Sequence, residues 1–463
     1  MHDLIEKTLA KTKHFCEVRI QSRISRGVSV SNGKLINANS RESIGAGIRV
    51  LVNGTWGFAS TSEMTPKGLE KALKDAETMA KLLSKTNEHK IEKLDTKCLV
   101  KGERLIEPNN DLRKMPIDKK IKLCLDTEKY AKGLSPLLTN TSASFREIID
   151  YKWIGTSDGA KAYIEDLKPQ FYSTCVAAKD GQMSSGFEAE GVTGGLDDLF
   201  EKKSPEKMAQ RAVKLAVDKI TAPHIVGGMH TVVLAPAMVG ILSHEAIGHT
   251  VEADFVLQGS IAAQMMGKVA GSELVTLKDA GTNTMKVGHP TGNIGIDDEG
   301  VQTKDVTIID HGVMRSYLHN RETAAHFGVE PTGNARAWNY SDLPIIRMRN
   351  TYIMPGNSKV EEIISSTKDG YYITLPGSGQ ADSNAEFMFG CEEIYEIKNG
   401  KIGKLCKNAT ISGDAFEVLK SVDMVGNDFE WAMGSGYCGK GQPAAVDGGG
   451  PTIRCKAMIG GQA

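Results

Sequence analysis

Two Asn-Gly pairs near the N-terminus constrain the fold of this chain more than any other feature of its sequence. They interrupt extended runs of β-branched and apolar residues, in VSVSNGKLINA from Val28 and IRVLVNGTWGFAS from Ile48. Asn-Gly readily adopts the positive φ angles of the two-residue turn that joins neighbouring antiparallel strands. The chain is therefore predicted to begin with a sheet built of hairpins.

Helical patterns follow this sheet at three places. Thr65 is placed to cap a helix that begins at Pro66, and a second amphipathic helix is expected from Ile117 to Lys132. Ser204 and Pro205 open a third. Strand-like segments occupy the stretch between the second and third helices, so we expect the helices to cover one face of a sheet.

The length of 463 residues predicts two domains, because a single core of this size is uncommon. The segment TAPHIVGG, which begins at Thr221, is the best place for the boundary. We expect an N-terminal α/β domain over residues 1–222. Residues 223–463 are expected to form a β-rich sandwich or barrel around one embedded helix, near residues 236–251. The predicted fold class is α+β.

Composition argues against several classes of protein. A formal charge of −1 leaves no excess of positive charge for a nucleic-acid backbone, and no apolar run is long enough to span a membrane. The first residues show no secretory signal, and the eight cysteines form no Cys-x-x-Cys pair. We therefore expect a cytoplasmic protein with reduced thiols and neither a membrane nor a nucleic-acid partner.

The segment His244-Glu245-Ala246-Ile247-Gly248-His249 has the composition of a metal site. Imidazole suits Zn²⁺, and a neighbouring carboxylate can take a proton from a metal-activated water. Its histidines are five residues apart, however, and a regular α-helix would place them about 140° apart. We expect a one-turn π-bulge to bring them to one side, with Gly248 easing the change.

Catalytic zinc needs a third protein ligand. Cys438 is the best candidate, because its glycine-rich loop GSGYCGKGQ lets a thiolate approach another element closely. Cys455 is the weaker rival. At this point the alternative remains open that each cysteine is a buried structural thiol and that the two histidines are unrelated.

Further blocks extend the pattern through the second half of the chain. In order, they are HEAIGHTVEADF, DDEGVQTKDVTIIDHGVMRSYLHNRETA, TGNARAWNYSDLPIIRMRNTYIMPG, GSGQADSNAEFMFGCEEIYEIKNGKI, SVDMVGNDF and GYCGKGQ. With them the chain resembles the TldD/PmbA metallopeptidases, also described as modulators of DNA gyrase. The N-terminal half matches chiefly through IGAGIRVLVNGTWGFAST. Because the histidine motif is present, the chain resembles the TldD-type catalytic subunit.

The resemblance implies a Zn²⁺ cofactor held by His244, His249 and Cys438, with Glu245 as the catalytic base. It also implies unfolded or extended peptide substrates, and either a homodimer or a heterodimer with a TldE/PmbA-like subunit. The chain departs from the common family pattern at three positions that leave the implied ligands in place: Thr250, Ala253 and Gly441. The alternative is a non-catalytic scaffold subunit with a vestigial motif.

Several polar residues near these motifs have roles that the sequence leaves open. Glu252 or Asp254 is placed to orient a ligand imidazole, and either can equally be a surface carboxylate. Arg336, Tyr340 and Arg347 are expected either to line a cleft or subunit contact, or to make structural hydrogen bonds.

Overall fold

The Asn-Gly pairs form the predicted turns in the computed structural model, which describes residues 1–87, 90–407 and 409–461. Asn32 and Gly33 have φ angles of 48° and 75°, and Asn53 and Gly54 have φ angles of 49° and 74°. The first turn joins β1 (Phe15–Ser31) to β2 (Lys34–Val52), and the second joins β2 to β3 (Thr55–Thr61). The hairpin sheet at the N-terminus is therefore confirmed.

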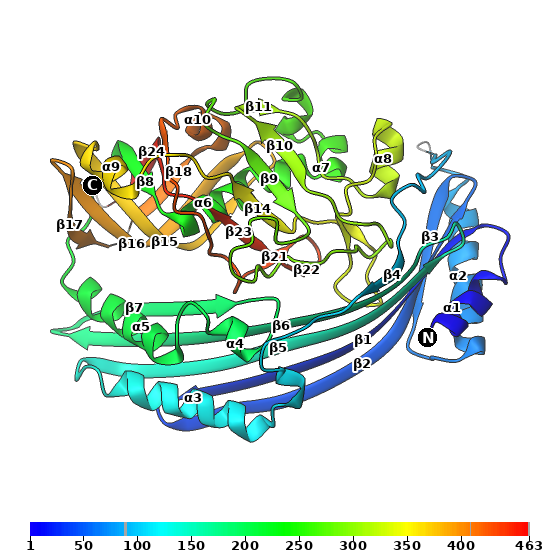
Figure 1. The fold of residues 1–463 in the computed structure, drawn as a ribbon, viewed down its shortest axis with the longest axis horizontal. Helices are drawn as coiled ribbons and strands as arrows, with labels where there is room; N and C mark the ends of the chain where they lie inside the picture. The colour runs from blue at the N-terminus through cyan, green and yellow to red at the C-terminus, as the bar shows by residue number, and fades with distance from the viewer. Residues whose placement is uncertain (88–89, 408, 462–463) are drawn as a thin grey trace.

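The first sheet has seven strands in the order β3-β2-β1-β5-β6-β4, with β7 also paired to β6. The further strands are β4 (Lys101–Arg104), β5 (Leu138–Thr156), β6 (Lys161–Lys179) and β7 (Gln182–Gly191). β2, β5 and β6 each have 19 residues, which corresponds to about 60 Å at the usual rise per residue. The long strands curve across the whole molecule (Figure 1).

Helices cover the outer face of this sheet. They are α1 (His2–Leu9), α2 (Pro66–Leu83), α3 (Ile117–Lys132), the short α4 (Leu196–Leu199) and α5 (Pro205–Ile220). The Thr65 hydroxyl accepts from the Gly68 N–H, and the Ser204 hydroxyl accepts from the Lys207 N–H. Leu69 and Leu73 of α2 are buried in one cluster with Ile48 of β2. The three predicted helices are confirmed. They were predictable because helix capping and hydrophobic periodicity depend on residues that are close in sequence.

The second half of the chain contains a closed five-stranded barrel, β15-β8-β24-β18-β16, in which β16 pairs back to β15. Its strands are β8 (Gly228–Leu234), β15 (Asp369–Ala381), β16 (Glu386–Lys398), β18 (Ala409–Asp414) and β24 (Ile453–Gly460). β17 (Lys401–Cys406) and β19 (Met424–Val425) extend it. The predicted α+β class with a β-rich second half is confirmed.

A second sheet packs beside the barrel, in the order β11-β10-β9-β14-β23-β20. Its strands are β9 (Leu277–Ala280), β10 (Val306–Asp310), β11 (Val313–Met314), β14 (Asn350–Ile353), β20 (Glu430–Trp431) and β23 (Asp447–Gly450). Two strand pairs stand apart: β12 (Ala335–Arg336) with β13 (Ile345–Ile346), and β21 (Tyr437–Gly439) with β22 (Pro443–Ala445).

One helical segment lies between the barrel and this second sheet. It runs through α6 (Pro236–Ile241), the π-helix η2 (Leu242–Gly248) and the 3₁₀ turn η3 (His249–Val251). Both α6 and η2 contact β14 and β23 on one side and β15 on the other. Short helices α7 (Ala253–Leu257), α8 (Arg321–Phe327), α9 (Val360–Ser365) and α10 (Ala415–Lys420), with the turns η1 (Leu112–Lys114) and η4 (Ile261–Gln264), complete the structure.

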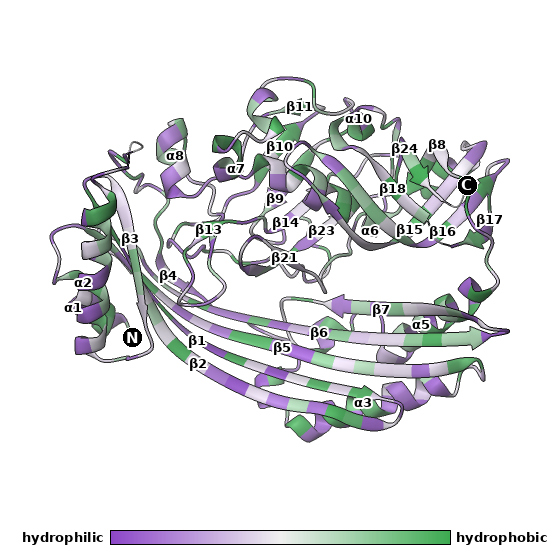
Figure 2. Cartoon of the chain, turned by 180° about the vertical axis from the view of Figure 1, so that it is seen from behind, coloured by the Kyte–Doolittle hydropathy of each residue, from purple (hydrophilic) through white to green (hydrophobic). Residues whose placement is uncertain are grey.

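The second half of the chain sits on the face of the long sheet opposite the helices (Figure 1). Polar and apolar residues alternate along the long strands, so each strand presents different chemistry to its two faces (Figure 2). The division of the chain into domains at residue 222 stays a prediction. Within the part of the chain that the structure describes, the helices lack the combined length and apolar content needed to cross a membrane.

Candidate metal centre

The π-helical turn brings the two histidines of the motif together. His244 and His249 both belong to the segment in which η2 passes into η3, and their ring centroids are 5.4 Å apart. A π-helix closes hydrogen bonds between residues five apart, so side chains at that spacing fall on nearly the same side. The predicted widening of the helix is confirmed, and it resolves the spacing problem of the motif.

Gly248 serves this turn for a different reason from the one expected. Its φ and ψ angles are −56° and −44°, which any residue adopts easily. A Cβ at this position would instead overlap the sulfur of Met348. The glycine is therefore required by the close approach of a core side chain, and not by backbone freedom.

Cys438 lies on the β21–β22 hairpin, which brings its sulfur next to the two histidines. Its Sγ lies 3.1 Å from Nε2 of His249. Arg347, which is 1% exposed, holds the hairpin by donating to the carbonyls of Cys438 and Gln442, each at 2.6 Å. One ligand atom from each of His244, His249 and Cys438 lies within 4.8 Å of the other two. The three distant donors thus share one location.

Electrostatics favour the ionised sulfur at this place. Burial opposes ionisation, but the His244 and His249 rings outweigh it and lower the pKa of the Cys438 thiol to about 4. In the same way, burial is outweighed at His249, where Cys438 and Glu252 raise the pKa to about 10. A thiolate is the form of cysteine that binds metal ions.

The donors fit a zinc ion. His244 is fully buried, and neither of its ring nitrogens has a hydrogen-bond partner among the described residues. Leaving buried polar atoms unpaired is costly, and a metal bound to one nitrogen would remove part of that cost. Imidazole nitrogen and thiolate sulfur are both zinc ligands, and catalytic zinc combines three protein ligands with a fourth position left for water or substrate.

Carboxylates and one lysine complete the surroundings. Glu245 has its carboxylate 3.6 Å from Nε2 of His249, with 28% of its side chain exposed. Glu252, fully buried, lies 2.8 Å from Nδ1 of His249. Asp254 contacts Lys440 instead, at 2.7 Å, and Lys440 also lies 3.3 Å from Glu252. Of the two carboxylates considered for the imidazole, the structure therefore places Glu252 against it.

Lys440 is the participant that sequence reasoning missed. In addition to these contacts, its ammonium lies 4.1 Å above the ring of Phe255. The sequence did show this lysine close to a proposed ligand, because it stands two residues after Cys438 in the glycine-rich loop. Its partners Glu252 and Asp254 are more than 180 residues away in sequence, so the pairing could not be inferred from spacing.

The remaining candidates are not placed as metal ligands. Cys455 is buried in barrel strand β24, where burial raises the pKa of its thiol. Arg336 donates to the Met348 carbonyl and lines a separate cavity. Tyr340 packs against the long sheet, where a Cβ at Gly45 would overlap its ring. Arg347 makes the structural hydrogen bonds described above.

Comparison with known proteins agrees with this fold. Models of the PmbA/TldA metallopeptidase family match in three parts: domain 1 at residues 16–80, the central domain at 110–220 and the C-terminal domain at 227–461. A metalloprotease of Methanocaldococcus jannaschii is 33% identical, and the alignment covers 98% of each chain. A zinc metalloprotease TldD homolog of Saccharolobus solfataricus is 29% identical over the full length of both chains.

A solved structure shares the whole fold. TldE from Thermococcus kodakarensis superimposes with a TM-score of 0.80 at 18% identity, covering 99% of each chain. The fold and the matching family models together define an α+β protein of the metallopeptidase type. The chain belongs to the PmbA/TldA metallopeptidase family, as the TldD/PmbA resemblance predicted.

Proposed function

We propose that this chain is a zinc peptidase that cleaves unfolded or extended polypeptides, with Glu245 as the general base. The observation that carries the proposal is the convergence of His244, His249 and Cys438 beside a partly exposed carboxylate. Membership of a metallopeptidase family supports the same reaction class. The relatives named above as metalloproteases align with nearly all of the chain, so the similarity is not confined to one domain.

Each residue of the centre has a separate task in this proposal. A zinc ion held by His244, His249 and Cys438 supplies Lewis acidity toward water and the peptide carbonyl. Glu245 accepts a proton from the attacking water and passes it to the leaving amine nitrogen. Glu252 holds Nδ1 of His249, which leaves Nε2 free to serve as a metal ligand.

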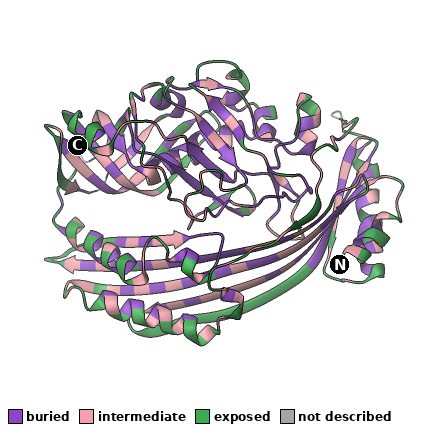
Figure 3. Ribbon diagram, in the orientation of Figure 1, coloured by how far each residue is buried: buried purple, intermediate pink, exposed green. Residues whose placement is uncertain are grey.

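An unpaired strand edge supports extended substrates. β3 pairs only with residues 46–52 of β2, so among the described residues no strand pairs with the outer edge of residues 34–45. This part of β2 is largely exposed (Figure 3). An extended peptide can add to such an edge through backbone hydrogen bonds, which tolerate many sequences. Under this proposal, an unfolded protein is cleaved faster than the same protein in its compact form.

The proposal includes an assembly of two subunits, either two copies of this chain or this chain with a TldE-like partner. The full-length similarity to a TldE structure supports a partner of the same fold. Light scattering after size-exclusion chromatography, on the chain alone and mixed with a TldE-like subunit, separates the two arrangements. A strictly monomeric species in both samples would contradict this part of the proposal.

The decisive experiment combines metal analysis with a digestion assay. We expect one zinc per purified chain and chelator-sensitive digestion of an unstructured polypeptide. Glu245→Gln is expected to keep the zinc and to lose about a hundredfold or more of the rate. Cys438→Ser is expected to lose zinc as well as activity. Glu206→Gln, at an exposed position of α5, is the matched control and should behave like the unmodified chain.

Two outcomes would overturn the proposal. Full activity in Glu245→Gln would exclude the glutamate as the base. Purified protein without stoichiometric zinc and without chelator-sensitive activity, alone or with its partner, would favour the non-catalytic scaffold subunit instead.

A further inference from the structure

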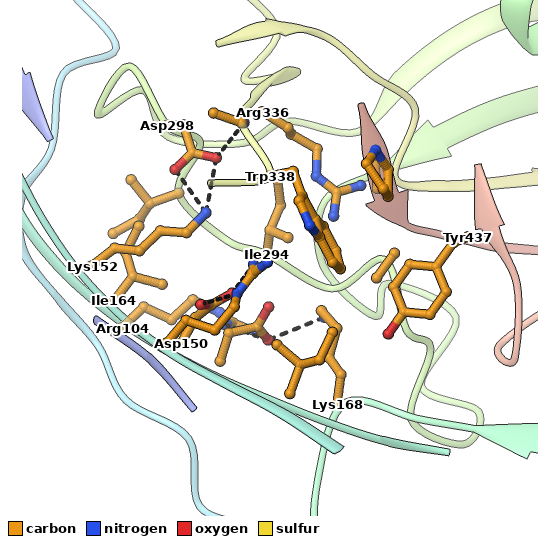
Figure 4. Close-up of a pocket in the computed structure, with 18 residues that line it drawn as sticks. Arg104, Asp150, Lys152, Ile164, Lys168, Ile294, Asp298, Arg336, Trp338 and Tyr437 are labelled. Atoms are coloured by element: carbon orange, nitrogen blue, oxygen red, sulfur yellow. Dashed lines mark hydrogen bonds and ion pairs between the residues drawn. The ribbon is translucent and has the colours of Figure 1, made fainter. Parts of the chain in front are cut away.

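A small cavity of about 50 Å³ lies between the long sheet and the second half of the chain. We call it the inner cavity. Figure 4 shows side chains from the sheet, including Arg104 and Lys168, facing Arg336, Trp338 and Tyr437 from the other side. Its volume holds a few water molecules or one small anion.

The inner cavity adjoins a wider opening. The outer groove, with a volume of about 550 Å³, shares Ile148, Trp338, Tyr437 and Pro443 with the inner cavity. The groove runs over the ends of β1 and β2, where it is also lined by Ser25, Asn37 and Asn39. The inner cavity and the outer groove therefore share part of their walls.

The lining of the inner cavity carries an excess of two positive charges. It has five cationic side chains, Arg23, Arg104, Lys152, Lys168 and Arg336, and three acidic ones, Asp150, Asp166 and Asp298.

Most of these charges are paired. Arg23 lies 2.6 Å from Asp150, and Lys152 lies 2.8 Å from Asp298. Asp166 is shared, since Lys168 is 3.1 Å and Arg104 is 3.9 Å away from it. These pairs leave no acidic lining residue for Arg336.

Arg336 is the exceptional member of this lining. It is only 9% exposed, and it makes one hydrogen bond within the described structure, from Nη1 to the Met348 carbonyl at 2.8 Å. No carboxylate forms an ion pair with it in the described part of the chain. Burial and the neighbouring Arg347 lower the pKa of Arg336 to about 10, so the guanidinium stays charged at neutral pH. Asp166, Asp298 and Asp279 act on Arg336 only without a direct ion pair. A buried cation without a directly paired anion is costly, and an anion in the cavity would reduce that cost.

We propose that the inner cavity is a binding site for a small oxyanion, a carboxylate or a phosphate, held by Arg336 with Lys168 and Arg104. A guanidinium presents paired N–H donors that match the oxygen atoms of either group. Lys168 is 5% exposed, and burial lowers its pKa to about 8, so a bound anion would also stabilise its charged form.

This site is separate from the candidate metal centre but adjoins the same hairpin. Tyr437 lines the inner cavity, whereas Cys438 is the next residue of β21 and side chains of successive strand residues point to opposite faces. Pro443, Ala444 and Ala445 of β22 line the cavity as well. An anion would therefore contact one face of the hairpin whose other face presents the Cys438 sulfur.

The test is calorimetric titration of the full-length protein, as purified, with sodium phosphate and separately with sodium acetate at constant ionic strength. We expect one saturable site for at least one of the two anions, and the anion that binds more tightly identifies the ligand class. Arg336→Gln should weaken binding about tenfold or more, because charge-assisted hydrogen bonds are lost. Arg336→Lys keeps the charge without the paired donors and should weaken it less.

Two further variants keep the test decisive. Lys168→Gln should also weaken anion binding, and it replaces Arg336→Gln in the test if that variant does not fold. Arg315→Gln is the control, because Arg315 is exposed and lies 4.0 Å from Asp310, outside the cavity.

Absence of saturable binding of either anion would overturn the proposal. Binding unchanged in both cavity variants would also overturn it, since the anion would then occupy another place such as the metal. None of these readouts depends on peptidase activity.

Discussion

Two histidines in this chain have opposite pKa shifts because their surroundings differ. His249 lies between a thiolate and a carboxylate, which raise its pKa to about 10 against the effect of burial. His319 is less exposed, at 3%, and it faces Tyr317 and the ring of Phe327 at 5.4 Å. Burial alone therefore lowers the pKa of His319 to about 4, and the residue is a neutral part of the core.

His319 predicts a specific loss of stability in acid. Its folded pKa of about 4 is below the unfolded value near 6.5, so its contribution is complete above pH 6.5 and is lost as pH falls toward 4. Between pH 7.5 and 4.5 we expect the free energy of unfolding to fall by about 2 kcal/mol more than in His319→Asn. Urea unfolding of both proteins at the two pH values measures this difference. Equal losses would show that His319 does not titrate in this range.

At the scale of elements, the π-turn η2 is the feature on which the candidate centre depends. It lies between the barrel and the second sheet, and six of its seven residues are buried. The turn is kept by packing from both sides, with Met348 pressed against Gly248. Isolated π-turns are rare and frequently occur at functional sites. Here the turn converts a five-residue spacing into a shared face for two imidazoles.

Gly248→Ala tests this packing. The new methyl group overlaps the Met348 sulfur, so we expect about 2 kcal/mol of destabilisation and weaker zinc retention against a chelator. Combining it with Met348→Ala should cost less than the sum of the two single variants, because the overlap is removed. Gly102→Ala is the control, since its nearest neighbouring atom would be 3.9 Å away. Additive costs in the double variant would exclude the overlap as the cause.

At the scale of the whole molecule, the two halves meet through buried charges. Val18 and Ile20 of β1, which face the outer helices, are apolar and buried. The alternate residues that face the second half are Glu17, Arg19, Gln21 and Arg23, and all four are buried. Arg19 donates to the carbonyls of Asn339 and Asp342, and the Arg23 guanidinium lies 4.1 Å above the ring of Trp338. The contact between the two halves of the chain is therefore polar, and its hydrogen bonds require a defined placement of one half on the other.

Glu299→Gln tests the most enclosed of these contacts. Glu299 is fully buried and pairs with Arg49 of the long sheet, which also contacts Glu17 at 2.9 Å. Losing one carboxylate leaves the buried positive charge of Arg49 less well compensated. We therefore expect the free energy of unfolding, measured by chemical denaturation, to fall by about 3 kcal/mol. Glu330→Gln, which removes an exposed pair with Lys304, should have little effect. Similar results for the two variants would show that the buried pair does not hold the halves together.

Local chemistry made much of the fold predictable. Asn32-Gly33 and Asn53-Gly54 form their turns because the required φ angles depend on those residues alone. Helix α3 begins and ends at the predicted residues, Ile117 and Lys132. The π-turn also followed from sequence, because five-residue spacing on one helix leaves few ways for two side chains to meet. A β-rich sandwich or barrel was predicted for the second half, but the closure through β15 and β16 could not be.

By itself, the sequence determined the turns, the capped helices, the widened turn and the kinds of side chain available for a metal centre. Only the tertiary structure decided which of these side chains meet. Cys438 lies 189 residues from His249 in sequence, and Lys440 lies 186 residues from Asp254. The cavity around Arg336 likewise needs both halves of the chain. The physical reason is range: backbone preferences act over a few residues, whereas contacts between distant segments arise only when the packed core brings them together.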